Sequence, residues 1–317
     1  MARLLLSSYG NQHRINQKNL LKPQKQTMND KKKAFRERLS QPGLLSAPGI
    51  FDMVSLRLAD TFGFDALYMT GFGTVASHMG LPDAGLATYS DMVGRVRAMA
   101  SMAQTPLIAD GDTGYGGLLN VAHTVRGYEA AGACAIQLED QEFPKKCGHT
   151  PGRRVIPMAD MVRKIQVASD ARSSSDFLII ARTDARSALG LDEALRRADA
   201  YARAGADILF VESPETQDEM RQIGRSSDLP LLANMVEGGR TPVLSQQTLE
   251  SMGYKLAIFP VTALLAATQA MKAVYESFKE SGSSVDTATP LMPFTELTKL
   301  MGFEEIWAFE KRYADPA

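Results

Sequence analysis

Eight short apolar runs recur along the chain after residue 40, and this repeat limits the possible folds more than any other feature. Each run is too short for a helix and is bounded by glycine, proline or charged residues, which is typical of a buried parallel strand. The runs are Leu44–Ala47, Ala66–Thr70, Leu107–Asp110, Ala135–Glu139, Leu178–Arg182, Ile208–Glu212, Leu231–Asn234 and Ala257–Pro260. The sequence therefore predicts eight parallel strands.

Amphipathic stretches separate the apolar runs. Leu191–Ala204 places its leucines and most of its alanines on one stripe, and Gly205 follows as a helix stop before the next run. Eight strand–helix units in about 240 residues match the size of a (β/α)8 TIM-type barrel. The competing architecture is a doubly wound open sheet, which usually carries a glycine-rich phosphate turn after its first strand. Because no such turn follows the first run, we expect the barrel.

The two ends of the chain fall outside this repeat. Residues 1–35 are basic, polar and almost free of acidic residues, so we expect a disordered or non-native extension, with Met28 as a candidate start. A mitochondrial transit peptide is the alternative. Residues 36–317 then form a single domain. Its segments Thr262–Ser281 and Phe294–Tyr313 exceed the eight units, and we expect these extra C-terminal helices to pack on a neighbouring subunit.

The composition excludes several classes of partner. The chain has 317 residues and a formal net charge of −1, with no basic stripe of the kind that binds nucleic acid. Two cysteines argue against a disulfide framework and fit a reducing compartment. No apolar run is long enough to span a membrane. We expect a cytoplasmic protein without nucleic-acid or membrane partners, or a protein of the mitochondrial matrix if the N-terminal segment is a transit peptide.

Polar residues follow most of the predicted strands at their carboxyl ends, where barrel enzymes place their active sites. An ordinary set of turns would carry mainly glycine, serine and asparagine. This chain instead presents Thr70, Gly71 and Phe72, then Asp110 and Asp112, Glu139 and Asp140, Arg182 and Asp184, Glu212, and Asn234 and Glu237. The pattern predicts an active site at this end of the barrel.

Carboxylates crowd the ends of two of these strands. Asp110 and Asp112 flank Gly111, and Glu139 and Asp140 end the adjacent strand. Like charges so close raise each other's pKa unless a cation neutralises them. Oxygen ligands without histidine favour Mg²⁺ over Zn²⁺. We therefore predict a Mg²⁺ site, with Mn²⁺ as the alternative metal; solvated loop acids are the competing interpretation.

A long loop after the fourth predicted strand carries the segment Lys145-Lys146-Cys147-Gly148-His149. Such loops close over barrel mouths. Neighbouring lysines and a histidine lower a thiol pKa, so Cys147 is a candidate nucleophile or proton donor. The competing interpretation is an exposed basic loop with an incidental cysteine. Cys134, beside a strand, is expected in the core.

Six segments together resemble the isocitrate lyase/phosphoenolpyruvate mutase superfamily, from about Leu44 to the C-terminus. They are TGFGTVASHMGLPD, ADGDTGYGG, LEDQEFPKKCGH, ARTDA, FVESP and NMVEGG. KKCGH is the most specific of them and marks the lyase branch. The resemblance implies a small di- or tricarboxylate substrate, and a homotetramer whose subunits exchange a C-terminal helix.

The resemblance also implies roles for individual residues. Asp110 and Asp112 would hold Mg²⁺, with Glu139 supporting its hydration shell. The substrate would be bound by Thr70, Gly71, Phe72, Asp83, Gly148, Arg182, Glu212 and Asn234. Cys147 would protonate a carbanion, with its thiol tuned by Lys145, Lys146 and His149, and Tyr68 would accept the substrate's hydroxyl proton.

The expected reaction is cleavage of a 2-hydroxy dicarboxylate to a 2-oxo acid and a carboxylic acid. Where the 2-methylisocitrate lyases place an arginine for a third carboxylate, this chain has Leu264 and Leu265. An unpaired buried carboxylate is costly, so we favour a 2-alkylmalate such as 2,3-dimethylmalate. Oxaloacetate hydrolysis to oxalate and acetate, 2-methylisocitrate cleavage and a non-catalytic metabolite-binding barrel are the alternatives.

Overall fold

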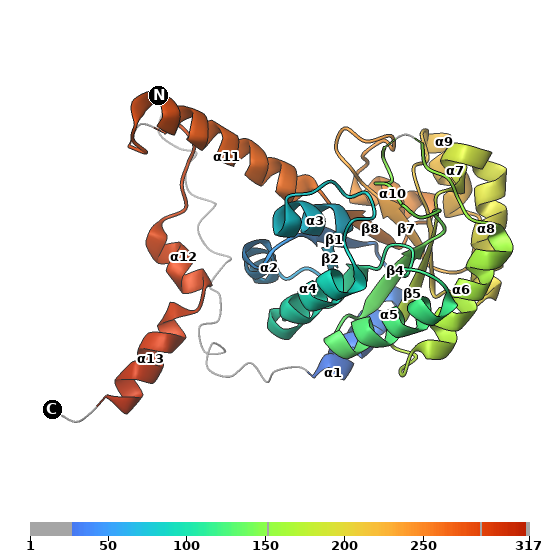
Figure 1. Ribbon diagram of the computed structural model, residues 1–317, viewed down its shortest axis with the longest axis horizontal. Helices are drawn as coiled ribbons and strands as arrows, with labels where there is room; N and C mark the ends of the chain where they lie inside the picture. Colours follow the sequence, from blue (N-terminus) through green and yellow to red (C-terminus); the bar gives the residue numbers. More distant parts are fainter. Residues whose placement is uncertain (1–26, 151, 286, 315–317) are drawn as a thin grey trace, which may run out of the picture.

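The computed structural model describes residues 27–150, 152–285 and 287–314 and contains a closed barrel of eight parallel strands (Figure 1). The strands are β1 (Leu45–Ile50), β2 (Leu67–Met69), β3 (Leu107–Asp110), β4 (Ala135–Glu139), β5 (Leu178–Thr183), β6 (Ile208–Val211), β7 (Leu231–Asn234) and β8 (Leu256–Phe259). Each pairs with its neighbour in the chain, and β8 pairs with β1 to close the ring. Every predicted apolar run overlaps one strand, so the barrel is confirmed and the open sheet is excluded.

Helices surround the strands on the outside (Figure 1). They are α2 (Met53–Ala59), the 3-10 turn η2 (Asp60–Phe62), α3 (Gly71–Met79), α4 (Tyr89–Met102), α5 (Leu118–Ala131), α6 (Met158–Ala171), α7 (Ala185–Leu189), α8 (Leu191–Arg203), α9 (Gln217–Gly224) and α10 (Gln246–Met252). The amphipathic stripe predicted for α8 is buried at Ala194 and Ala198. Arg197 is buried beside them, which the stripe did not predict. One apolar cluster lies between strands and helices, and a second fills the barrel interior.

Helix α1 (Met28–Ser40) closes the amino end of the barrel. Its Phe35 and Leu39 are buried in the interior cluster, beside the first residues of several strands. Lys32 forms a buried ion pair with Glu129, 3.2 Å apart. Residues 28–35 of the expected extension therefore belong to a helix that packs on the barrel, and a boundary at residue 35 would cut through it. Residues 1–26, the rest of that expected extension, lie outside the described residues.

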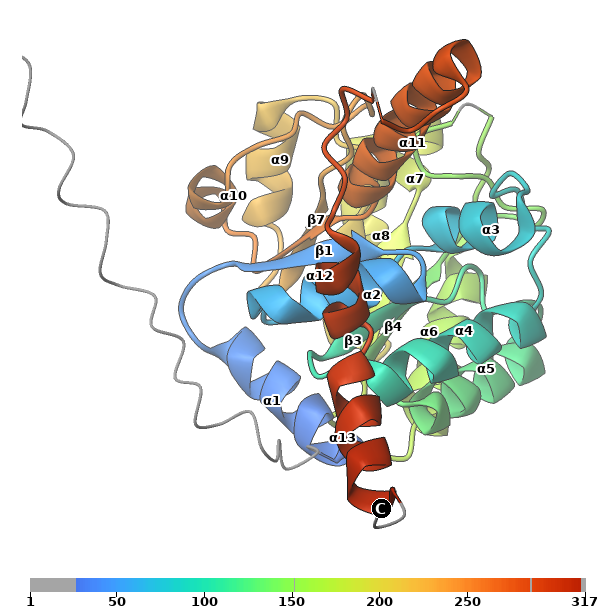
Figure 2. The same ribbon diagram turned by 90° about the vertical axis from the view of Figure 1, so that its left-hand side faces the viewer.

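The C-terminal helices extend outward from the barrel and touch it at few points: α11 contacts β1 at its start, and Arg57 of α2 donates to the Leu300 carbonyl. Helix α11 (Thr262–Ser281) projects from β8, and α12 (Phe294–Leu300) and α13 (Phe303–Tyr313) follow it (Figures 1 and 2). None of the three has a buried residue. The helical segment predicted over Phe294–Tyr313 consists of two helices, which are separated at Gly302, where φ is 90°. Within the described part of the chain, no helix is both long and apolar enough to cross a membrane.

Candidate active site

The carboxyl ends of the strands surround a cavity of about 200 Å³, and the loop between β4 and α6 contributes to its wall. This end of the barrel is opposite the end that α1 closes. The predicted site residues that line the cavity are Tyr68, Thr70, Phe72, Asp83, Asp110, Glu139, Lys146, Cys147, Gly148, His149, Arg182 and Asn234. Side chains from segments far apart in the sequence therefore meet at one place.

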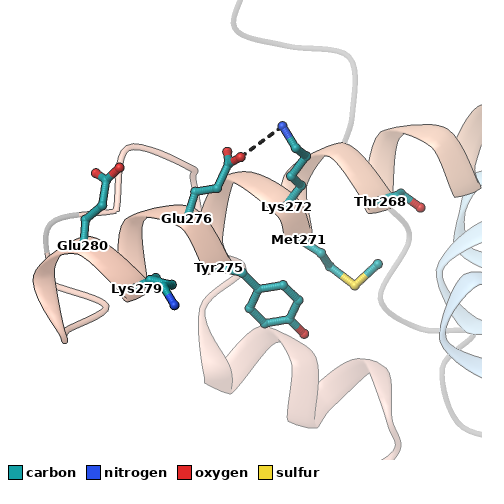
Figure 3. A pocket seen from close by; sticks show the side chains of 7 residues that line it. All are labelled: Thr268, Met271, Lys272, Tyr275, Glu276, Lys279 and Glu280. Atoms are coloured by element: carbon teal, nitrogen blue, oxygen red, sulfur yellow. Dashed lines mark ion pairs between the residues drawn. The ribbon is translucent and has the colours of Figure 1, made fainter.

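The three other predicted residues lie against this cavity. Gly71 packs so closely on the Asp110 carboxylate that a Cβ atom would collide with it. Asp112 contacts Lys145, and Glu212 is fully buried 3.4 Å from His149 Nε2. A larger hollow of about 720 Å³ runs along α11, where Met271 and Tyr275 project (Figure 3). It shares no lining residue with the cavity, and we assign it no part in the reaction.

Backbone geometry sets the positions of the carboxylates that are predicted to hold Mg²⁺. Asp110 ends β3, and Gly111 follows it against the carbonyl of Gln137, where a side chain would not fit. Asp112 has a φ of 48°, and its backbone N–H donates to Asp110 Oδ1 over 3.1 Å. Its carbonyl in turn accepts from the Glu139 N–H over 2.9 Å. The turn thus brings three carboxylates from two adjacent strands together.

Two tyrosines support this turn from the side of α5. The Tyr128 hydroxyl donates to the Asp110 carbonyl over 3.1 Å and lies 2.9 Å from the Tyr115 hydroxyl. Tyr115 itself has a φ of 57°. Burial raises the pKa of both phenols well above the usual value, so both stay protonated. Neither tyrosine stands out in the sequence, because its role depends on contacts between separate segments.

Lys145 is the cation of the carboxylate cluster. Its ammonium group forms ion pairs with Asp83 and Asp112, and its side chain is buried. Burial alone would lower the pKa of Lys145, but these carboxylates raise it well above the usual value. Burial, with Asp110 and Asp83 nearby, raises the pKa of Asp112 to about 7 despite this lysine. One ammonium group therefore does not neutralise the cluster.

The donor set fits Mg²⁺. The carboxylates of Asp83, Asp110, Asp112 and Glu139 supply only oxygen, and the buried Glu139 Oε1 has no hydrogen-bond partner. Among the described residues, no three His, Cys, Asp or Glu side chains are close enough to hold a metal by themselves. Mg²⁺ binds few protein carboxylates directly and keeps waters or substrate oxygens as its other ligands, so a site with few carboxylate ligands suits it.

Asp140 does not join this cluster. Its position after Glu139 predicts that it lies with the other carboxylates, but its side chain turns into the barrel wall. Its Oδ2 accepts hydrogen bonds from Thr183 Oγ1 at 2.7 Å, Tyr201 at 2.8 Å and Arg197 at 3.0 Å. These partners explain why Arg197 is buried. Successive strand residues face opposite sides, so Glu139 and Asp140 cannot both point into the cavity.

Arg182, one residue before the end of β5, lies among buried carboxylates. Its Nε atom lies 2.9 Å from Asp184 Oδ2 and 3.4 Å from Glu139 Oε2, and Nη1 lies 3.4 Å from Glu212 Oε2. Burial would lower the pKa of Arg182, but these carboxylates outweigh it and raise that pKa. The guanidinium is therefore held as a fixed cation facing the cavity.

The Cys147 thiol differs from the expectation. Burial raises its pKa above the usual value, whereas basic neighbours were expected to lower it. The Lys145 ammonium is paired with carboxylates, and Lys146 Nζ bonds the Gly152 carbonyl at 3.1 Å on the exposed side of the loop. Neither lysine therefore lowers the thiol pKa. Cys147 is held as a thiol, the form that donates a proton.

His149 anchors the Cys147 loop to two other strands. Its Nδ1 accepts from the Arg240 N–H over 3.2 Å, and Nε2 lies 3.3 Å from Asn234 Nδ2 and 3.4 Å from Glu212 Oε1. Burial lowers the pKa of His149, which favours the neutral imidazole. His149 thus holds the loop, and its effect on the thiol is through the backbone.

Tyr68 reaches the carboxylate cluster through Gln137, a residue that the sequence analysis did not single out. The Tyr68 hydroxyl donates to Gln137 Oε1 over 2.9 Å, and Gln137 Nε2 donates to Asp110 Oδ1 over 3.2 Å. The available signal was a fully buried amide inside the apolar run of β4. Burial, reinforced by the Asp110 charge, raises the pKa of Tyr68 well above the usual value.

Several known proteins are similar to this chain in sequence. Residues 35–279 match the family model described as phosphoenolpyruvate phosphomutase. A 2,3-dimethylmalate lyase of Eubacterium barkeri is 47% identical over 88% of this chain and 97% of its own length. A 2-methylisocitrate lyase of Bacillus subtilis is 39% identical over 88% of this chain and 92% of its own.

Two solved structures are also similar. An oxaloacetate acetylhydrolase bound to the inhibitor 3,3-difluorooxalacetate superposes with a TM-score of 0.84 at 33% identity, over 90% of this chain and 97% of its own. A phosphonopyruvate hydrolase in complex with oxalate and Mg²⁺ superposes with a TM-score of 0.81 at 33% identity, over 89% of this chain and 99% of its own.

Proposed function

The chain belongs to the phosphoenolpyruvate phosphomutase family, within the isocitrate lyase/phosphoenolpyruvate mutase superfamily, and we propose that it is a Mg²⁺-dependent carbon–carbon lyase acting on a 2-alkylmalate-type acid. Its products would be a 2-oxo acid and a carboxylic acid. The observation that carries the proposal is the Cys147 thiol lining the same cavity as Asp110, Glu139 and Arg182.

The first step is binding of the 2-hydroxy acid. Asp110 and Asp112, supported by Glu139, would hold Mg²⁺, which polarises oxygen atoms when it is bound. Arg182 would pair with a substrate carboxylate, and the backbone N–H groups at the start of α3, after Thr70, would receive another. Tyr68, at the inner end of the cavity, would accept the hydroxyl proton as its phenolate, a form that the positive charge of bound Mg²⁺ would favour against the effect of burial.

The second step is protonation of the carbanion that the broken carbon–carbon bond leaves. Cys147 supplies this proton, because burial keeps it in the thiol form. The half-buried loop around it limits the access of water to the carbanion. Lys146, whose ammonium donates to the Gly152 carbonyl, would contribute to the loop and not to the proton transfer.

The cavity wall favours a substrate with alkyl groups over one with a third carboxylate. One side is formed by Val236, Ile258, Pro260, Val261 and Leu265. The lysines and arginine that line the cavity are Lys145, Lys146 and Arg182, and two of these are already paired with carboxylates. A further carboxylate would therefore be left unpaired at the apolar side, which is costly.

A substrate panel tests the proposal. The purified chain would be assayed with 2,3-dimethylmalate, 2-methylisocitrate, isocitrate, oxaloacetate and phosphonopyruvate, with and without Mg²⁺. We expect turnover of 2,3-dimethylmalate with release of a 2-oxo acid. Faster turnover of oxaloacetate to oxalate would make the chain a hydrolase instead. Efficient cleavage of 2-methylisocitrate would overturn the argument from the apolar wall. Saturable binding without turnover of any acid would indicate a binding protein.

We also propose that the chain self-associates through α11, α12 and α13, as a tetramer with exchanged helices. These helices carry large exposed side chains, among them Tyr275, Phe294, Trp307 and Phe309. An apolar surface of this kind on an otherwise unpacked segment is typical of a protein–protein interface. Light scattering coupled to gel filtration measures the assembly directly, and a monomer at micromolar concentration would contradict it.

A further inference from the structure

The loop that carries Cys147 is tied to the barrel by a second arginine, Arg153. Its side chain is only 2% exposed. Nη1 donates to Asp184 Oδ1 over 2.6 Å, and Nη2 donates to Ser187 Oγ of α7 over 2.6 Å. A buried guanidinium that spans two acceptors fixes the loop more firmly than exposed contacts do.

The partner of Arg153 is shared with the cavity. Asp184 also accepts from Arg182, through Nε to Oδ2 and through Nη2 to Oδ1, both over 2.9 Å. Oδ1 therefore bonds the loop arginine and the substrate-facing arginine at the same time. Burial would raise the pKa of Asp184, but the two arginines outweigh it and lower that pKa, so the carboxylate stays charged.

A second contact joins the same groups next to the thiol. Ser213 Oγ donates to the Gly148 carbonyl over 2.8 Å and lies 3.4 Å from Arg153 Nη2. Ser213 has a φ of 58°, which L-residues rarely adopt outside special sites. Gly148 packs so closely on Arg182 that a Cβ atom would collide with its Nη2. Gly148, the residue after Cys147, is therefore in direct contact with Arg182.

We propose that Arg153 is a positioning residue, which locks the Cys147 loop over the cavity and aligns Arg182 through their shared partner Asp184. Displacing Arg153 releases the loop from Asp184 and removes one of the bonds that orient Ser213 toward Gly148. Both the proton donor and the substrate-facing cation then lose their fixed positions. The effect on turnover rests on the proposed lyase function, whereas the effect on the loop does not.

The test uses the full chain and three variants: Arg153→Met, Arg153→Lys and Arg172→Met. Arg172 is the matched control, because it is also a largely buried arginine paired with an aspartate, Asp207, at the opposite end of the barrel. Lysine keeps the charge beside Asp184 but cannot span two acceptors as arginine does. Arg153→Lys should therefore restore the position of the loop only in part. Circular dichroism and thermal unfolding verify that each variant is folded.

The first readout is alkylation of Cys147 by iodoacetamide, located by mass spectrometry. The chain has two cysteines, and Cys134 is buried in the core, so it serves as an internal reference. We expect alkylation of Cys147 to be about tenfold faster in Arg153→Met, intermediate in Arg153→Lys, and unchanged in Arg172→Met. If Arg153→Met does not fold, Arg153→Lys alone decides: faster alkylation supports the proposal and an unchanged rate overturns it.

The second readout is turnover. Misplaced catalytic groups can cost about 100-fold in rate, so kcat should fall by that order in Arg153→Met, with a smaller change in KM. Unchanged alkylation and kcat in Arg153→Met would overturn the proposal. Equal effects in Arg172→Met would also overturn it, since a general loss of stability would then explain them. If wild-type protein turns over no acid in the panel, the proposed function fails while the alkylation readout still tests the loop.

Discussion

The Tyr68 hydroxyl donates a 2.9 Å hydrogen bond to the side-chain oxygen of Gln137, at the inner end of the cavity. Because Gln137 in turn donates to Asp110, the phenol is linked to the carboxylates of the proposed metal site. Neither contact could be read from the positions of these residues in the sequence. The hydrogen bonds through Gln137 therefore connect Tyr68, the proposed acceptor of the hydroxyl proton, with the proposed Mg²⁺ site that would bind the hydroxyl.

Tyr68→Phe should therefore reduce kcat without unfolding the barrel. The ring that packs in the core is kept, and only the hydroxyl is lost, so the loss in kcat should be about 10²- to 10⁴-fold, as for general acid–base groups. Gln137→Leu should also lower kcat while leaving Tyr68 in place. Steady-state kinetics with thermal unfolding as the folding check measures both. If the kcat of Tyr68→Phe stays within roughly threefold of the wild-type value, Tyr68 does not take part in the proton transfer.

Lys145 and Lys146 are adjacent, yet their substitutions should differ widely. Lys145→Met leaves Asp83 and Asp112 without their cation, and breaking buried ion pairs typically costs about 3–5 kcal/mol. Lys146→Met loses only an exposed hydrogen bond to Gly152, so its stability should change by less than about 0.5 kcal/mol. Urea unfolding and kcat/KM compare the two. Equal losses would show that the lysines are not separated in this way.

Cys147→Ser tests the proton donor. A serine hydroxyl is a far weaker acid than a thiol, so kcat should fall by about 10²- to 10⁴-fold while Mg²⁺-induced stabilisation stays. Cys134→Ser is the matched control, because that thiol is buried beside β4 away from the cavity. It should lower the melting temperature and leave kcat near wild type. Normal turnover by Cys147→Ser would refute the assignment.

Removal of metal should abolish turnover, and Mg²⁺ should restore it. A readout independent of activity is thermal stability: a ligand at 100 times its Kd stabilises the folded state by about 2.7 kcal/mol. We expect Mg²⁺ to raise the melting temperature of wild type but not of Asp112→Asn. Full activity in excess chelator, or an equal shift in the variant, would contradict the metal site.

Asp184 should make stability depend on acid pH. Its pKa is lowered in the fold because Arg182 and Arg153 outweigh the effect of burial, so it stabilises the fold above its unfolded pKa of about 3.9. This contribution is lost as the pH falls through the lower folded pKa. Asp184→Asn should therefore be much less stable than wild type at about pH 7, with a smaller difference at about pH 3. Urea unfolding across this range measures it, and a constant difference would contradict the prediction.

The barrel could be predicted because its signals are local. The apolar runs of β3, β4 and β7 match the predicted strands residue for residue, and the stop after α8 lies where its glycine predicts it. The C-terminal helices were also found, apart from the break at Gly302. Helix α1 was not, because its polar sequence hides the two apolar residues, Phe35 and Leu39, that pack in the barrel.

The sequence by itself determined the fold class and the set of chemical groups at the strand ends, since hydrophobic periodicity and glycine stops act over a few residues. The tertiary structure alone decided how those groups pair. It turned Asp140 into the barrel wall, placed Lys145 and not Lys146 among the carboxylates, and kept Cys147 a thiol. These outcomes depend on burial and on contacts between distant segments, which neighbouring residues in the chain do not encode.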